Sequence, residues 1–324
     1  MNTELSNFRQ LGYACGMLGF SILMNMISVM LIYVYVPPNN SDLIPLIPQI
    51  TLWGIFSLLS IVVTGGRLFD AISDPLVAFW SDRSQHRRGR RTPFMAWALL
   101  PAALFCTLIF VPFHYGESTH NLWWLAGTQL CFYLSLTLYI VPYNALLPEL
   151  SANQNDQIRL STLLSVGYVL GIIVSSQTPL LADCYQNTFP SISRNDAILW
   201  AIASLAALAA LFMIFPILSI DEKRHCSSQP ITIPLRLAFG QTLRNQNFVL
   251  FVVAETFYFI AITMIISGLL YYLRVLLELE ESLGGFVMGT MVLTSFLFYP
   301  FIGQLTRRFG VKSIILLSFV WLGV

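Results

Sequence analysis

Charged side chains are scarce in this sequence of 324 residues. Asp, Glu, Lys and Arg together make up 10% of it, whereas hydrophobic residues make up 56%. Because soluble domains carry charge on about a quarter of their residues, this composition excludes an ordinary soluble domain and indicates a membrane protein. The formal net charge is only +1, so no excess of positive charge points to a nucleic-acid partner.

Motifs for catalysis and for metal binding are also missing. The sequence contains no H-E-x-x-H, no G-x-S-x-G and no phosphate-binding glycine loop. Its five cysteines lie mostly in apolar segments and form no C-x-x-C pair, so we expect them to pack as small hydrophobic residues. We therefore predict neither an enzyme nor a protein with a resident metal or cofactor.

Long apolar segments make up most of the chain. Eight have the length of about 20 residues that a helix needs to cross a bilayer. They are residues 11–36, 49–80, 93–113, 122–148, 159–182, 196–218, 247–273 and 282–304. A ninth starts near Lys312 and is too short to span, so we expect the sequence to be truncated inside a helix. The pattern predicts an all-α, multi-pass membrane protein.

The polar segments predict both orientation and domain organisation. Basic residues fall mainly in the N-terminal tail and in every second loop, which places the N-terminus on the inner side of a cytoplasmic or plasma membrane. The polar stretch 221–246 separates a six-helix bundle over 1–220 from a partial bundle over 247–324, with helices 7, 8 and part of 9. A glycine pair, an apolar span and a basic turn recur in the same order over 65–91 and 284–312, as in proteins with internal repeats.

Three charged residues interrupt the second apolar segment. Arg67, Asp70 and Asp74 are spaced three and four residues apart, so they share one face of a helix. A charge at the bilayer centre costs about 2.5–3.5 kcal/mol on insertion scales, and two carboxylates on one face require a bound cation or a water-lined cavity. For Asp70, a structural ion pair with Arg67 is an equally good alternative. Asp74 has no basic residue one turn away, which favours an ion-coupling role.

Three motifs resemble those of a known family. They are RLFDAISDP at 67–75, the basic turn SDRSQHRRGRRTP at 81–93, and PYNALLPEL at 142–150. In this order they are similar to the glycoside–pentoside–hexuronide:cation symporters, the melibiose permease-like branch of the major facilitator superfamily. The resemblance implies two six-helix halves, of which this chain holds the first and part of the second. It also implies a cation-coupled symporter that alternates access between the halves.

The resemblance also implies binding residues. The two helix-two aspartates of that branch bind the coupling ion together with neighbouring polar groups, which match Asp70, Ser73, Asp74 and Thr137. The coupling ion would be sodium or a proton. The acidic residues with which the galactoside permeases hold sugar are replaced by Ser21 and Ile140, which with Tyr143 and Asn144 are expected to line the substrate cavity.

The replaced carboxylates leave the substrate open. We expect a sugar or glycoside, with a lysolipid or another amphipathic solute as the alternative, because lysolipid symporters of the same branch also lack the sugar carboxylates. A further alternative is an inactive fragment. The expected partners are a small-molecule substrate, the coupling cation and the lipid bilayer, for a protein that acts as a monomer.

Charged residues at the inner ends of the spans are expected to form a gate or a structural latch. They comprise Asp82 and the basic-turn residues Arg83, Arg90 and Arg91. Glu149 ends the fourth span, where a negative charge is unfavourable at the C-terminal end of a helix, so we expect it to pair with an arginine of the basic turn. Arg67 joins this structural group as the candidate partner of Asp70.

Overall fold

The computed structural model describes residues 6–37, 44–48, 51–52, 56–151, 153–226, 235–271, 290, 294, 297–298 and 301–323. The chain divides into two compact units, Met1–Pro230 and Ile231–Val324. This boundary falls inside the predicted connecting segment 221–246.

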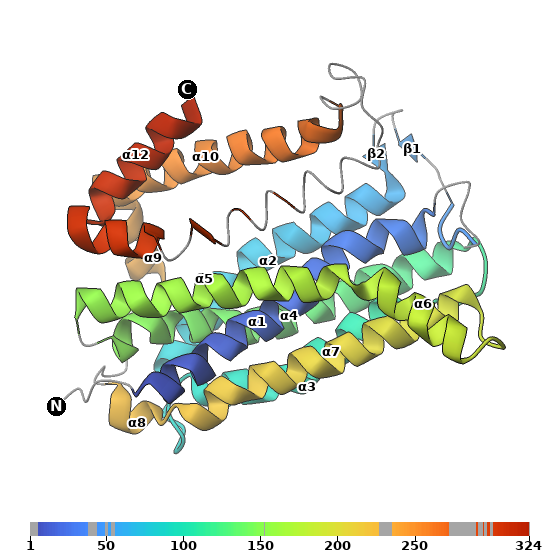
Figure 1. Ribbon diagram of the computed structural model, residues 1–324, viewed down its shortest axis with the longest axis horizontal. Coiled ribbons are helices and arrows are strands. Elements are labelled where there is room, and N and C mark those ends of the chain that lie inside the picture. The colour runs from blue at the N-terminus through green and yellow to red at the C-terminus, as the bar shows by residue number, and fades with distance from the viewer. Residues whose placement is uncertain are drawn as a thin grey trace. The chain divides into compact units, whose positions relative to one another are not determined.

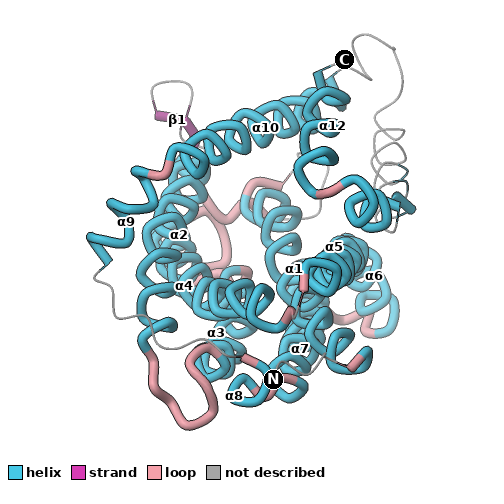
Figure 2. Tube along the Cα trace, turned by 90° about the vertical axis from the view of Figure 1, so that its left-hand side faces the viewer, coloured by secondary structure: helices cyan, strands magenta, loops and turns pink. Residues whose placement is uncertain are grey.

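The first unit is a bundle of helices. They are α1 (Asn7–Tyr35), α2 (Leu58–Arg83), α3 (Thr92–Ile109), α4 (Thr119–Leu150), α5 (Gln154–Ser176), α6 (Thr178–Thr188), α7 (Arg194–Ser219) and α8 (Glu222–His225). Helix α1 packs between α5 and α7, and α3 packs between α4 and α7, while α2 lies against α4 (Figures 1 and 2). The functional residues predicted on α2 and α4 are therefore on neighbouring helices.

Most of these helices are suited to a bilayer. Five segments within the described residues are long and apolar enough to cross a membrane, namely α1, α3, α4, the α5–α6 segment Gln154–Thr188, and α7. Helix α2 is also long enough, with 26 residues, but it carries Arg67, Asp70 and Asp74 in its middle. The prediction of an all-α membrane protein is confirmed, apart from one very short hairpin.

That hairpin corrects the predicted start of the second span. The span was expected from residue 49, but strands β1 (Thr51–Leu52) and β2 (Phe56–Ser57) pair antiparallel, and α2 begins only at Leu58. Ser57 caps the helix, because its hydroxyl accepts a hydrogen bond of 3.1 Å from the backbone N–H of Ser60. The cap therefore fixes the start of the helix at Leu58, although the apolar sequence begins further upstream.

The fifth predicted span, 159–182, is also corrected, because it is broken rather than continuous. Helix α5 ends at Ser176, and α6 starts at Thr178 with Pro179 in its first turn. Proline has no backbone N–H and cannot continue the hydrogen-bond ladder of the preceding helix. The N–H of Gln177 bonds instead to the carbonyl of Val174 at 3.1 Å, which closes α5 with a tighter turn.

The second unit contains three labelled helices among its described residues. They are α9 (Leu235–Arg244), α10 (Gln246–Tyr271) and α12 (Val311–Gly323). Helices α10 and α12 contact each other, since the rings of Tyr258 and Phe319 meet edge to face at 5.5 Å. The predicted seventh span, 247–273, corresponds to the helix α10, whereas most of the predicted span 282–304 lies outside the described residues.

The contact between α1 and α5 depends on small residues. A side chain at Gly167 would place its Cβ 2.8 Å from the carbonyl oxygen of Ala14, and one at Gly171 would lie 2.7 Å from that of Leu18. The Ser21 hydroxyl donates a 2.6 Å hydrogen bond to the Tyr168 carbonyl across the same contact. Close backbone approach through small residues is the usual way in which helices associate in lipid, where hydrophobicity does not drive them together.

Gly171→Ala should therefore destabilise the first unit. Alanine normally stabilises a helix relative to glycine, but at this position the Cβ requires α1 to move, with an expected cost of about 1–3 kcal/mol. The matched control is Gly127→Ala on α4, where nothing lies within 4 Å of the added Cβ. Thermal unfolding of both variants in detergent should show a lower midpoint for Gly171→Ala alone; equal midpoints would contradict the proposed close packing.

Candidate ion and substrate site

The two aspartates of α2 meet a hydroxyl from α4. Thr137 is fully buried, and its Oγ1 donates a 2.6 Å hydrogen bond to Oδ1 of Asp70. Asp74 lies one turn further along α2 and interacts with both the Asp70 carboxylate and the Thr137 hydroxyl. Ser73, on the same helix, is buried, and its hydroxyl donates a 3.1 Å hydrogen bond to the backbone carbonyl of Asp70. The structure thus brings three of the predicted cation ligands together, Asp70, Asp74 and Thr137, while the hydroxyl of Ser73 is bonded to the backbone of its own helix.

Glycine allows α2 and α4 to approach each other beside this cluster. A Cβ at Gly66 would lie 2.6 Å from the Gln129 amide nitrogen and 2.7 Å from the ring of Tyr133. Gly66 is one turn before Asp70 on the helix, so the close approach brings the Thr137 hydroxyl within reach of the carboxylate. The contact is therefore a consequence of the sequence of both helices.

The cluster offers a cation only oxygen atoms. Two carboxylates and the hydroxyl of Thr137 meet where α2 contacts α4, and both carboxylates are half-buried. Hard cations prefer oxygen ligands, and a bound cation offsets the repulsion between two carboxylates in an apolar surrounding. The chemistry of the donor set fits the predicted coupling ion, although the role of each residue stays a prediction.

In the described part of the chain, Arg67 does not form the ion pair with Asp70 that the structural alternative requires. The guanidinium instead lies 5.4 Å from the centre of the Tyr133 ring and 3.9 Å from the sulfur of Met24. In this conformation Asp70 is engaged by Thr137, which favours the ion-site interpretation over the structural pair.

The predicted substrate residues fall into two groups. Ile140 is half-buried and Asn144 exposed, and both share the face of α4 that carries Thr137. Ser21 and Tyr143 are fully buried. Neither of these two lies at an exposed surface of the first unit, and their place in a substrate cavity stays a prediction.

Tyr143 belongs to an aromatic stack inside the bundle. Its ring lies 4.4 Å from that of Tyr13 and 5.7 Å from that of Tyr139, with nearly parallel planes. Its hydroxyl donates to the Tyr13 carbonyl at 2.6 Å, and the Tyr13 hydroxyl donates back to the Tyr143 carbonyl. This reciprocal pair ties α1 to α4, so the motif residue serves packing in this conformation.

A network of buried ion pairs lies at the basic-turn end of the bundle. We call it the clamp, and it consists of Asp82, Arg90, Arg91, Glu149 and Glu222. Arg91 reaches Asp82 at 2.9 Å and Glu149 at 2.8 Å, and Arg90 reaches Glu149 at 3.1 Å. The expected pairing of Glu149 with the basic turn is confirmed. All members lie in the first unit, so these contacts join α2, α4 and α8 to the start of α3.

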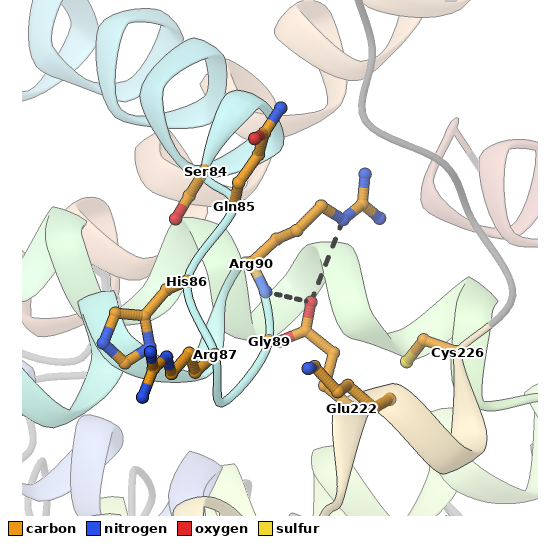
Figure 3. A pocket seen from close by; sticks show the side chains of 9 residues that line it. Ser84, Gln85, His86, Arg87, Gly89, Arg90, Glu222 and Cys226 are labelled. Atoms are coloured by element: carbon orange, nitrogen blue, oxygen red, sulfur yellow. Dashed lines mark hydrogen bonds and ion pairs between the residues drawn. The ribbon is translucent and has the colours of Figure 1, made fainter.

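Glu222 is the member of the clamp that the sequence did not reveal. Its carboxylate accepts hydrogen bonds from the backbone N–H groups of Arg90 at 2.8 Å, Arg91 at 3.0 Å and Thr92 at 3.1 Å, and from the Thr92 hydroxyl. The contacts with Arg90 are drawn in Figure 3. It thereby satisfies free N–H groups at the start of α3 and complements the helix dipole. Glu222 lies in a polar segment more than a hundred residues from the basic turn, so no sequence motif or spacing could have indicated this contact.

Two further residues complete the description of this end. The guanidinium of Arg83 lies 4.1 Å from the ring centre of Phe79 on its own helix, and its role as a latch residue stays a prediction. Burial, reinforced by the carboxylates of Glu149 and Glu222, raises the pKa of the Cys226 thiol to about 12. Cys226 is therefore neutral and adds no negative charge beside the clamp.

The fold is that of a helical membrane protein. A sequence model of the MFS/sugar transport protein family matches residues 12–324, so the chain belongs to this family. The family predicted from the three motifs is confirmed.

Individual relatives agree with this assignment. An uncharacterized symporter of Synechocystis is 31% identical over 211 residues, which cover 59% of this chain and 36% of that protein. A sodium-dependent lysophosphatidylcholine symporter of Danio rerio is 25% identical, with 81% and 54% covered, and an isoprimeverose transporter of Lactiplantibacillus pentosus is 21% identical, with 78% and 52% covered. The chain thus spans about half of the length, or less, of these relatives.

Gly89→Ala should test the fit of Glu222 into the basic turn. Gly89 and Gly116 both have a positive φ, at 119° and 110°, so alanine meets similar backbone strain at either position. Only at Gly89 would the new Cβ also meet a side chain, that of Glu222. We expect Gly89→Ala to lower the free energy of unfolding by about 1–3 kcal/mol more than Gly116→Ala, because the carboxylate loses buried donors. If thermal unfolding shows that both variants lose the same free energy of unfolding, the contact with Glu222 does not contribute to the effect of Gly89→Ala.

Proposed function

We propose that this chain works in a cation-coupled symporter. The observation that supports this most strongly is the cluster of Asp70, Asp74, Ser73 and Thr137 at the contact between two membrane helices. Two half-buried carboxylates that form no ion pair within the described residues are costly in lipid, so a functional reason for them is expected. A transporter, rather than an enzyme, is also what the family membership supports.

The cluster provides a physical basis for coupling. Without a cation, the site carries two negative charges whose passage through the apolar interior during alternating access is unfavourable. A bound cation reduces this charge and also bridges α2 to α4. An ion that binds one conformation better than another shifts the equilibrium between them by that difference in affinity. Sodium or a proton fits this role, and the sodium-dependent relatives support sodium.

The substrate is proposed to bind next to this cluster. Thr137, Ile140 and Asn144 are three, and then four, residues apart and share one face of α4. A solute that contacts Asn144 and Ile140 would sit within two helical turns of the ion, which permits each to affect the affinity for the other. We propose a sugar or glycoside, in line with the family and with the isoprimeverose transporter among the relatives.

A lysolipid is the second candidate substrate. It is favoured by the apolar Ile140 on the same face as the cation ligands, and by the lysophosphatidylcholine symporters among the relatives. Neutral hydrogen bonds contribute about 0.5–1.5 kcal/mol each, against 1.5–3 kcal/mol for those to charged groups. A hydroxyl-rich sugar would thus be held less tightly here than by carboxylates.

Asp74→Asn is expected to abolish coupling. The amide is nearly isosteric with the carboxylate but removes the charge that offsets the bound cation. In proteoliposomes containing the full-length transporter, the variant should equilibrate substrate without accumulating it, and the sodium or proton dependence should disappear. Accumulation against a gradient with unchanged ion dependence would contradict the role of Asp74.

A matched control separates this effect from a general loss of charge. Asp183→Asn removes a carboxylate of the same kind from an exposed ion pair with Arg194, far along the chain from α2. Exposed ion pairs contribute little to stability, so this variant should retain coupled transport. Thermal unfolding of both variants verifies that neither has lost its fold.

The N-terminus and the basic turn are proposed to face the cytoplasm. The motive is the loop charge asymmetry, which the positive-inside rule converts into an orientation. In a variant without the five native cysteines, Gln85→Cys should be protected from an impermeant thiol reagent added to intact cells, whereas Glu117→Cys should react. Labelling of Gln85→Cys from outside, with Glu117→Cys protected, would reverse the assigned orientation.

A further inference from the structure

A cavity of about 440 Å³ lies between the basic turn and α8. Its lining residues, drawn in Figure 3, are Ser84, Gln85, His86, Arg87, Gly89, Arg90, Glu222, Lys223 and Cys226. The cavity is at the end of α2, ten residues or about 15 Å along the helix from Asp74, so it is separate from the proposed ion site.

The clamp holds the walls of this cavity in place. Glu222 accepts hydrogen bonds from three successive backbone N–H groups at the end of the turn, and Gly89 provides the close approach that these bonds require. Both oxygens of the Glu222 carboxylate are therefore engaged, and Arg90 is paired with Glu149 and Glu222. The negative charge that lines the cavity is thus already matched.

Positive charge in the lining is not matched in the same way. Within the part of the chain that the structure describes, no carboxylate forms an ion pair with Arg87 or Lys223, and both are exposed. The Nδ1 of His86 accepts a 3.2 Å hydrogen bond from the backbone N–H of Arg88, which places the ring proton on Nε2. A guanidinium, an ammonium and an imidazole N–H therefore line one cavity.

We propose that this cavity binds the phosphate group of a phosphate ester. A guanidinium matches the oxygens of a phosphate in a two-pronged geometry, and a lysine adds a mobile point charge. The volume exceeds that of a bare phosphate and leaves space for the esterified glycerol of a headgroup. The ester could belong to a phospholipid at the membrane surface or to a soluble metabolite, and both present the same group to Arg87 and Lys223.

Titration calorimetry on the full-length protein in a non-ionic detergent tests the proposal. The probes are dioctanoyl phosphatidylglycerol and sn-glycerol 3-phosphate, which share a phosphate ester and differ in the acyl chains. Arg87→Gln combined with Lys223→Gln should weaken binding of the probe by about tenfold or more. Each basic residue near an anionic headgroup strengthens binding by about fivefold, and the double variant loses two of them. Both side chains are exposed, so the unfolding temperature should stay unchanged.

The matched control removes two charges from the basic turn of the second unit. Arg307→Gln with Arg308→Gln makes the same change in net charge at exposed positions outside the cavity, and should alter the dissociation constant by less than about twofold, as expected for screened charges. If only the lipid binds, and the cavity variant loses this binding, the cavity is a headgroup site. If glycerol phosphate displaces the lipid, or is the only probe that binds, the cavity is a site for the soluble ester. No binding of either probe, or equal losses in both double variants, would overturn the proposal.

Discussion

A charge inside a bilayer must meet an opposite charge, a hydrogen-bond partner or water, and the first unit meets this requirement differently at two places on α2. At its end, Asp82 is matched by Arg91, which also reaches Glu149 on α4. In its middle, Asp70 receives a neutral hydroxyl from Thr137, and no ion pair with Arg67 is found among the described residues. One helix therefore carries both a neutralised and an unneutralised charge cluster.

This difference separates structural charge from functional charge. The clamp contains two arginines and three carboxylates, and Glu222 is further satisfied by the N-terminus of α3. Removing one partner would leave a buried charge unpaired, so such a network stays assembled. Within the described residues, no ion pair compensates Asp70 or Asp74, and the hydroxyl of Thr137 is neutral. Binding energy is available only where coordination is incomplete, which supports the proposal that the coupling ion binds in the middle of α2.

Apolar length and periodic charge predicted much of this from the sequence. Spans of about 20 apolar residues predicted helices, and spacings of three and four placed Asp70 and Asp74 on one face. Local chemistry that hydrophobicity does not record set the real limits, namely the Ser57 cap and the break before Pro179. Contacts between distant segments were beyond reach: nothing near Glu222 in the sequence indicates α3, and the burial of Tyr143 depends on Tyr13 from another helix.

The packing of the first unit explains how an ion could affect the whole bundle. Helix α4 carries Thr137 on one face and, six residues later, Tyr143, whose hydroxyl is bonded to α1. It ends at Glu149 in the clamp, which also holds α2 and the start of α3. Any shift of α4 caused by ion binding at Thr137 must therefore be shared by α1, α2 and α3. Close-packed interiors transmit displacements rather than absorb them. The contacts of α4 therefore tie the first unit together, and on the proposed function a displacement of α4 at Thr137 would be passed on to the neighbouring helices.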